Sequence, residues 1–195
     1  WSLGGSQHSP DHKRLAYAVD EKGSELYTIR IRDLDTGQDL EDVIPDTRGD
    51  FVWTTASNTI VYVRLDENHR PLSVYRHVIG TPHTDDIRVY HEPDSAIYVG
   101  IGKTQSSRFI LIDAHDHQTS EVYLIDADNP STEPRLVAPR QAGHEYSIEH
   151  HNDALVILTN SGDAVDFRIV EAPVNNPGQE NWREIIPHRP GRLII

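Results

Sequence analysis

The chain of 195 residues contains no cysteine and no methionine. The absence of cysteine excludes disulfide bonds and thiolate metal sites, and it is consistent with a reducing compartment such as the cytoplasm. No stretch approaches the ~18 apolar residues that a membrane-spanning helix needs, and no charged-then-apolar signal peptide opens the chain. Because position 1 is Trp rather than Met, we expect the chain to belong to a longer polypeptide.

Basic residues are also few, with 18 Lys and Arg against 31 Asp and Glu, for a net charge of −13. An acidic surface disfavours nucleic acids and anionic membranes as partners, and it attracts basic ligands or peptides. The same charge can serve solubility alone. It therefore narrows the class of partner without identifying one.

Helical periodicity is absent, and the pattern present instead is a repeat of short alternating segments. The segments are residues 25–30, 73–81, 121–126 and 166–171, with aromatic anchors at Tyr27, Tyr75, Tyr123 and Phe167. The anchors are 48, 48 and 44 residues apart. Repeats of ~40–50 residues built from short strands are typical of propeller blades, in which each small sheet buries its faces against its neighbours.

Each repeat is predicted to fold as four antiparallel strands, so the fold class is all-β with sixteen strands. The first repeat has strands at residues 1–6, 14–20, 25–32 and 40–44, where Pro45 ends the outer strand because it has no N–H for the ladder. The remaining strands are predicted at residues 50–54, 59–65, 73–79 and 87–91; 96–103, 108–113, 120–126 and 135–138; and 145–150, 154–159, 166–171 and 182–186. The blades would span residues 1–46, 50–92, 95–140 and 144–188, and residues 192–195 would begin a further blade.

Several segments carry a family resemblance that keeps its order along the whole chain. They are Trp-Ser-Leu-Gly-Gly-Ser at 1–6, Val-Tyr-Arg-His-Val-Ile-Gly-Thr at 74–81, Thr-Ser-Glu-Val-Tyr-Leu-Ile-Asp at 119–126 and His-Glu-Tyr-Ser-Ile-Glu-His at 144–150. Together they resemble the propeller of the prolyl oligopeptidase family, and within it the oligopeptidase B, or protease II, branch.

The resemblance implies a partial β-propeller, about four consecutive blades of a seven-bladed ring. In that family the ring caps an α/β-hydrolase domain with a Ser-Asp-His triad and admits only short peptides. Members of the oligopeptidase B branch cut after Lys or Arg. The hydrolase domain is absent from this sequence, so we expect a non-catalytic gating portion of a serine oligopeptidase. No catalytic, cofactor-binding or metal-binding residue is assigned. The alternative is a stand-alone propeller that binds proteins or peptides.

Two glycine-rich segments mimic catalytic motifs. Gly4-Gly5-Ser6-Gln7-His8 approaches the Gly-x-Ser-x-Gly nucleophile elbow, but His8 replaces the second glycine and no helix is predicted after it. Residues 100–104, Gly-Ile-Gly-Lys-Thr, resemble the end of a phosphate-binding loop, but Ile97 stands where the first glycine belongs. The alternation of this segment indicates an inner strand of a blade instead.

Histidines and acidic turns raise the possibility of metal binding, which we consider as a third hypothesis. His144-Glu145 with His150 and His151 lacks the helical His-Glu-x-x-His spacing, and His115-Asp116-His117 is a second candidate pair. The turns at Asp33/Asp35, Asp85/Asp86 and Asp126/Asp128 lack the glycine and terminal Glu of a calcium loop, so Asx-turns are favoured. Trp53, Tyr62, Tyr75 and Tyr123 are predicted to pack between blades rather than to stack on nucleic acid bases.

The expected inner strands at 1–6, 50–54, 96–103 and 145–150 would line a central channel. The expected partners are short basic peptides and a hydrolase domain. Open faces on the two end blades would favour self-association.

Overall fold

The computed structural model describes residues 1–194. Within them, strands make up 52% of the chain and helical residues 3%, which confirms the all-β prediction. The described part holds fifteen strands rather than the sixteen predicted. They form antiparallel sheets of seven, four and four strands.

The seven-stranded sheet has the order β1-β2-β3-β4-β5-β6-β7. Its members are β1 (Ser2–His8), β2 (Arg14–Asp20), β3 (Tyr27–Asp33), β4 (Asp39–Trp53), β5 (Thr59–Leu65), β6 (Pro71–Val78) and β7 (Ile87–His91). A short 3₁₀ turn, η1 (His83–Asp85), precedes β7. We describe this sheet as two four-stranded units that share β4.

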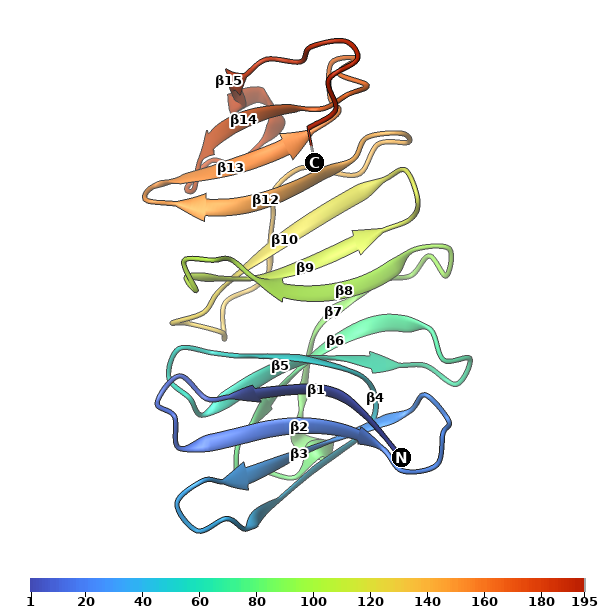
Figure 1. Cartoon of the computed structure of the whole chain (residues 1–195), viewed down its shortest axis with the longest axis vertical. Helices are drawn as coiled ribbons and strands as arrows, with labels where there is room; N and C mark the ends of the chain where they lie inside the picture. The colour runs from blue at the N-terminus through green and yellow to red at the C-terminus, as the bar shows by residue number, and fades with distance from the viewer. Residues whose placement is uncertain (195) are drawn as a thin grey trace.

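The other two sheets follow in chain order as the third and fourth units. The third unit comprises β8 (Tyr98–Lys103), β9 (Phe109–His115), β10 (Ser120–Asp126) and β11 (Arg135–Leu136). The fourth comprises β12 (Tyr146–His151), β13 (Ala154–Thr159), β14 (Arg168–Pro173) and β15 (Arg183–Ile186), with a 3₁₀ turn, η2 (Gln179–Asn181), before the last strand. Figure 1 shows the units stacked along the long axis, from β1–β3 at one end to β12–β15 at the other.

The prediction that Pro45 ends a strand was wrong, because β4 runs without interruption from Asp39 to Trp53. The register on β3 shifts between the pairs Ile29↔Ile44 and Tyr27↔Thr47, so one extra residue is accommodated there. Asp46 has φ 57°, and such a bulge tolerates a proline that cannot donate to the ladder. The predicted outer strand of one repeat and inner strand of the next are therefore one strand.

Two of the four aromatic anchors, Tyr27 and Phe167, were also wrong, because they do not hold the same place in their units as Tyr75 and Tyr123. Tyr75 and Tyr123 hold equivalent places in their units. The first residue of the preceding strand pairs with Val78 in the second unit and with Asp126 in the third, and each tyrosine lies three residues before that partner. The residue at that place in the first unit is Arg30 rather than Tyr27. Phe167 precedes β14 and has φ 64°, so the predicted strand 166–171 begins two residues too early.

Three hydrophobic cores lie between successive units, so the second and third units have apolar packing on both faces. The first core includes Ile29, Ile31, Ile44, Phe51, Trp53, Ile60 and Tyr62. The second includes Val52, Val61, Val63, Val74, Val99, Ile110, Ile112 and Ile125, and the third includes Phe109, Leu124, Tyr146, Ile148, Leu155, Ile157 and Val170. Ile60 and Val61 of β5 are fully buried in different cores, so this strand is covered on both sides.

Beyond β15 the described chain has no further strand, and Ile194 donates its backbone N–H to the Asp166 carbonyl at 3.0 Å. The last residue of the further blade predicted at 192–195 lies outside the described residues. No helix in residues 1–194 is long and apolar enough to cross a membrane.

Candidate functional site

The glycine-rich segment that mimics a nucleophile elbow is an extended strand. Gly4 and Gly5 lie in β1, with Ser6 paired to Tyr17 of β2. A Cβ at Gly5 would come within 2.8 Å of the Gly49 carbonyl oxygen. The glycines therefore allow β1 to approach β4 closely, and the sharp turn that exposes a nucleophile is not formed.

The segment that mimics a phosphate-binding loop is strand β8, as predicted from its alternation. Lys103 donates from Nζ to the Trp53 carbonyl at 3.0 Å, and burial lowers the pKa of its ammonium group. Trp53 in turn donates its indole N–H to the Gln7 carbonyl at 3.0 Å. These contacts join β1, β4 and β8 edge to edge.

The histidines singled out from the sequence do not converge. His115 Nδ1 lies 3.3 Å from Asp113, while His117 is exposed in the turn that follows. His144 is buried with Nε2 3.0 Å from Thr159 Oγ1, whereas His151 is exposed. Among residues 1–194, no three His, Asp or Glu side chains are placed to hold a metal ion.

Two serine–histidine pairs occur, and neither is completed into a triad. Ser106 Oγ lies 2.9 Å from His150 Nδ1, and Ser73 Oγ lies 2.9 Å from His91 Nδ1. Within the described part of the chain, no carboxylate contacts the other ring nitrogen of either histidine. A triad needs that carboxylate to hold the imidazole tautomer and to stabilise the imidazolium.

The acidic turns behave largely as predicted. Asp126 Oδ1 accepts the Asp128 backbone N–H at 2.9 Å, as in an Asx-turn, and Asp33 Oδ1 accepts the Thr36 backbone N–H, three positions on, at 2.8 Å. The aromatic residues also pack as predicted. Trp53 and Tyr62 are buried in the first core, and the Tyr62 and Tyr75 rings stack at 5.9 Å.

A buried polar network around His77 was missed from the sequence. The His77 side chain is 0% exposed, with Nδ1 2.7 Å from Asp86 Oδ1 and Nε2 2.9 Å from Asp42 Oδ1. Tyr62 donates its hydroxyl to Asp86 Oδ2 at 2.8 Å, and the Gly80 N–H donates to Asp42 at 2.6 Å. Because both ring nitrogens face carboxylates, both act as donors and the ring is an imidazolium.

The pKa values of this network follow from its geometry. Burial alone would lower the pKa of His77, but hydrogen bonds to Asp86 and Asp42 outweigh burial and raise that pKa above its ordinary value. Burial, together with the Asp86 charge, raises the pKa of the Tyr62 hydroxyl well above its usual range. The network fastens β4, β6 and the loop before β7 together, and none of its members is a serine.

A second buried ionic cluster joins the second and third units. Arg140 forms ion pairs with Glu92 and with Glu121, the latter at 2.9 Å. Tyr90 donates its hydroxyl to Glu92 at 2.8 Å. Burial would raise the pKa of Glu92, but Arg140 and the other donors lower it below its ordinary value. Both carboxylates are satisfied by these partners, so the cluster is structural.

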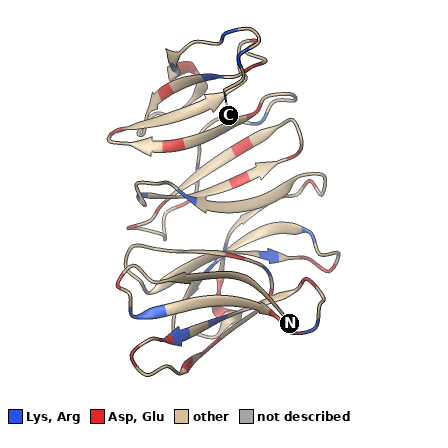
Figure 2. Ribbon diagram, viewed as in Figure 1, with Lys and Arg blue, Asp and Glu red and all other residues tan. Residues whose placement is uncertain are grey.

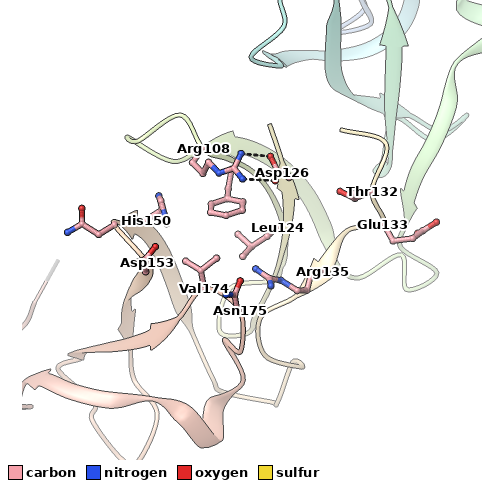
Figure 3. Close-up of a pocket in the computed structure, with 12 residues that line it drawn as sticks. Arg108, Leu124, Asp126, Thr132, Glu133, Arg135, His150, Asp153, Val174 and Asn175 are labelled. Atoms are coloured by element: carbon pink, nitrogen blue, oxygen red, sulfur yellow. Dashed lines mark hydrogen bonds and ion pairs between the residues drawn. The ribbon is translucent and has the colours of Figure 1, made fainter. Parts of the chain in front are cut away.

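A groove with a volume of about 660 Å³ lies between the third and fourth units (Figure 3). Its walls are Arg108, Phe109, Leu124, Asp126, Thr132, Glu133, Arg135, His150, Asn152, Asp153, Val174 and Asn175. Arg108 makes a two-pronged pair with Asp126, at 2.7 and 2.8 Å. Acidic and basic residues are interspersed over the whole fold in Figure 2, without a basic stripe of the kind that binds nucleic acid.

The family model described as "Prolyl oligopeptidase, N-terminal beta-propeller domain" matches residues 1–194. The chain is 36% identical over 190 residues to dipeptidyl aminopeptidase BI of Pseudoxanthomonas mexicana, covering 97% of this chain and 26% of the relative. It is 38% identical over 168 residues to protease 2 of Moraxella lacunata, covering 85% of this chain and 24% of the relative.

Solved structures agree with these relatives. Oligopeptidase B from Leishmania major superposes with a TM-score of 0.90 at 29% identity, over 96% of this chain and 27% of that protein. Oligopeptidase B from Trypanosoma brucei, with covalently bound antipain, gives a TM-score of 0.87 at 30% identity, over 97% and 26%. The chain thus spans about a quarter of the length of the proteins it matches. It belongs to the prolyl oligopeptidase family, as an N-terminal β-propeller region.

Proposed function

We propose that this chain is the gating portion of a serine-type oligopeptidase that hydrolyses short peptides after Lys or Arg. The observation that carries the proposal is the match to oligopeptidase B along almost the whole chain, with a TM-score of 0.90. Hydrolysis would be performed by a Ser-Asp-His triad in an α/β-hydrolase domain outside this sequence. The incomplete serine–histidine pairs support a non-catalytic role for the 195 residues themselves.

In this proposal the four units are consecutive blades of a seven-bladed ring, spanning residues 1–46, 50–92, 95–140 and 144–188. The inner strands would be β1, the second half of β4, β8 and β12. Contacts between successive inner strands support this order. They run from Gln7 to Trp53, from Trp53 to Lys103, and from the backbone N–H of Gln105, in the turn after β8, to Glu149 of β12 at 2.9 Å. These strands would surround the channel that peptides pass through.

The gate would act by size and by charge. A ring of packed blades excludes folded proteins, and the net charge of −13 favours the entry of basic peptides over acidic ones. The partners in this proposal are therefore short basic peptides and the hydrolase domain, in the cytoplasm. Exposed apolar side chains near the two ends, such as Trp1 at 79% and Leu193 at 60%, also support self-association when these units are produced alone.

The proposal is tested by comparing the 195-residue chain with the longer protein that contains it, using Arg and Lys p-nitroanilides. We expect no turnover by the chain alone, and turnover blocked by a serine-directed phosphonofluoridate in the longer protein. The longer protein should cleave a short Arg-containing peptide but spare a folded protein with exposed Arg residues. Removal of residues 1–195 should abolish that size selection.

Inhibitor-sensitive hydrolysis by the chain alone would refute the non-catalytic role. Equal cleavage of peptides and folded proteins by the longer protein would refute the gate. Saturable peptide binding without hydrolysis in any longer form would favour the stand-alone binding propeller instead.

A further inference from the structure

The groove between the third and fourth units contains a basic side chain with no partner. In Figure 3 the guanidinium of Arg135, from β11, extends toward Leu124, Val174 and Asn175. No hydrogen bond or ion pair joins this guanidinium to another side chain or carbonyl among residues 1–194. Its five N–H donors are therefore free to bind a ligand.

None of the acidic residues that line the groove forms an ion pair with Arg135. Asp126 makes a two-pronged pair with Arg108, which also pairs with Asp128. Glu133 also lines the groove, and in Figure 3 its side chain extends away from Arg135. Asp153 lines the opposite wall.

An apolar floor separates the two charged ends. Phe109 is 7% exposed and Leu124 is 2% exposed, and both belong to the third core, against which Val174 packs. These side chains are held by tertiary packing, so the floor is preformed. A preformed hollow with a few fixed polar groups is the usual design of a small-ligand site, and its volume lies within the usual range of about 300–1,000 Å³.

We propose that this groove binds the C-terminal residue of a peptide that ends in an apolar side chain. The terminal carboxylate pairs with Arg135, because guanidinium and carboxylate match in charge and in two-pronged geometry. The apolar side chain packs on Val174, which is only partly buried, next to the buried Leu124. The amide N–H of the terminal residue lies on the side of Asp153, which accepts it.

The arrangement discriminates against other ligands. A peptide ending in Lys or Arg would place a second cation near Arg135, over an apolar floor that offers this cation no partner. A phosphate group has a second negative charge, which Asp153 and Asp126 would repel and which no second free guanidinium would pair with. The site therefore differs in ligand class from the proposed channel for basic peptides, and it does not depend on that proposal.

The probe is N-acetyl-Ala-Leu with a free carboxylate, titrated into the isotopically labelled 195-residue chain and followed by amide chemical shifts. For a ligand of this size we expect a Kd on the order of a millimolar. The shifts should map to β10, β11 and the loops at residues 152–153 and 174–175. The C-terminal amide of the same peptide should bind roughly tenfold more weakly, since it loses the charge-assisted pair.

Arg135→Gln should weaken binding of the acid by a similar factor, about tenfold, and should leave binding of the amide unchanged. Arg88→Gln is the matched control, because Arg88 is an exposed arginine on β7 of the second unit and should leave binding unchanged. Equal affinity for acid and amide in the unaltered protein would overturn the proposal without any variant. Shifts confined to other parts of the fold would overturn it as well.

Discussion

Replacing His77 with Gln tests the physical account of the buried network most directly. The imidazolium is fully buried between Asp42 and Asp86, at 2.9 and 2.7 Å. Gln has no charge, so both carboxylates would lose their cationic partner in the interior. Removing one member of a buried ion pair costs about 3–5 kcal/mol of unfolding free energy. For a chain of this length, that cost lowers the melting temperature by on the order of 10 °C.

The pH dependence provides a sharper criterion than the magnitude. The pKa of His77 is raised in the folded state. The folded protein therefore holds a proton that the unfolded chain releases near its ordinary pKa of about 6.5. The stabilisation is fully present below that unfolded pKa and is lost as the pH rises through the higher folded pKa.

The assay is urea unfolding of the wild type and His77→Gln, followed by circular dichroism at several values between about pH 5.5 and 8.5. The difference in unfolding free energy should be largest at the acidic end and should shrink as the pH rises. His117→Gln is the control, since His117 is exposed, and it should change stability by less than about 0.5 kcal/mol. A difference for His77→Gln that is below about 1 kcal/mol, or that grows with pH, would refute the imidazolium assignment.

Two further predictions concern burial and backbone strain. Burial lowers the pKa of His144, so the wild type should lose stability as the pH falls below the pKa of an unfolded histidine, about 6.5. In the same urea assay, the unfolding free energy of His144→Gln should fall less steeply with decreasing pH. Identical pH dependence of the two proteins would contradict this prediction. Gly49 has φ 98°, and a Cβ there would lie 2.9 Å from Tyr27 Cγ, so Gly49→Ala should destabilise by about 1–3 kcal/mol. Gly102→Ala should be nearly neutral, because no described atom lies within 4 Å of the added Cβ. Thermal unfolding of both variants provides the comparison, and equal losses of stability would refute the steric argument.

Strand positions were predictable because alternation and turn residues are local signals. The ranges 14–20, 59–65, 87–91, 120–126 and 154–159 match β2, β5, β7, β10 and β13 at both ends. Phe167 misled because its apolar ring continues the alternation, while its positive φ places it in the turn before β14. Pro45 misled because a proline usually marks an edge, whereas here a bulge absorbs it.

The polar sites were much less predictable, because they depend on residues brought together by the fold. Asp42 and His77 are 35 positions apart, and nothing local to either residue indicates the other. Asp86 lies in an acidic turn that favoured an Asx-turn, yet its carboxylate binds the buried imidazole instead. The Arg135 groove is likewise formed by two different sheets, so its residues share no motif.

The bulge at Pro45 and Asp46 also sets which residues of β4 face the first core. Before the bulge the residue that faces the first core is even-numbered, Ile44, and after it the residues that face this core are odd-numbered, Phe51 and Trp53. Ile44 and Phe51 are separated by an odd number of positions, so in an uninterrupted pleat they would point to opposite sides. One inserted residue restores their common side. Deleting it would turn the side chains of one half of β4 to the opposite face, so this one residue keeps the two units that share β4 packed against the same core.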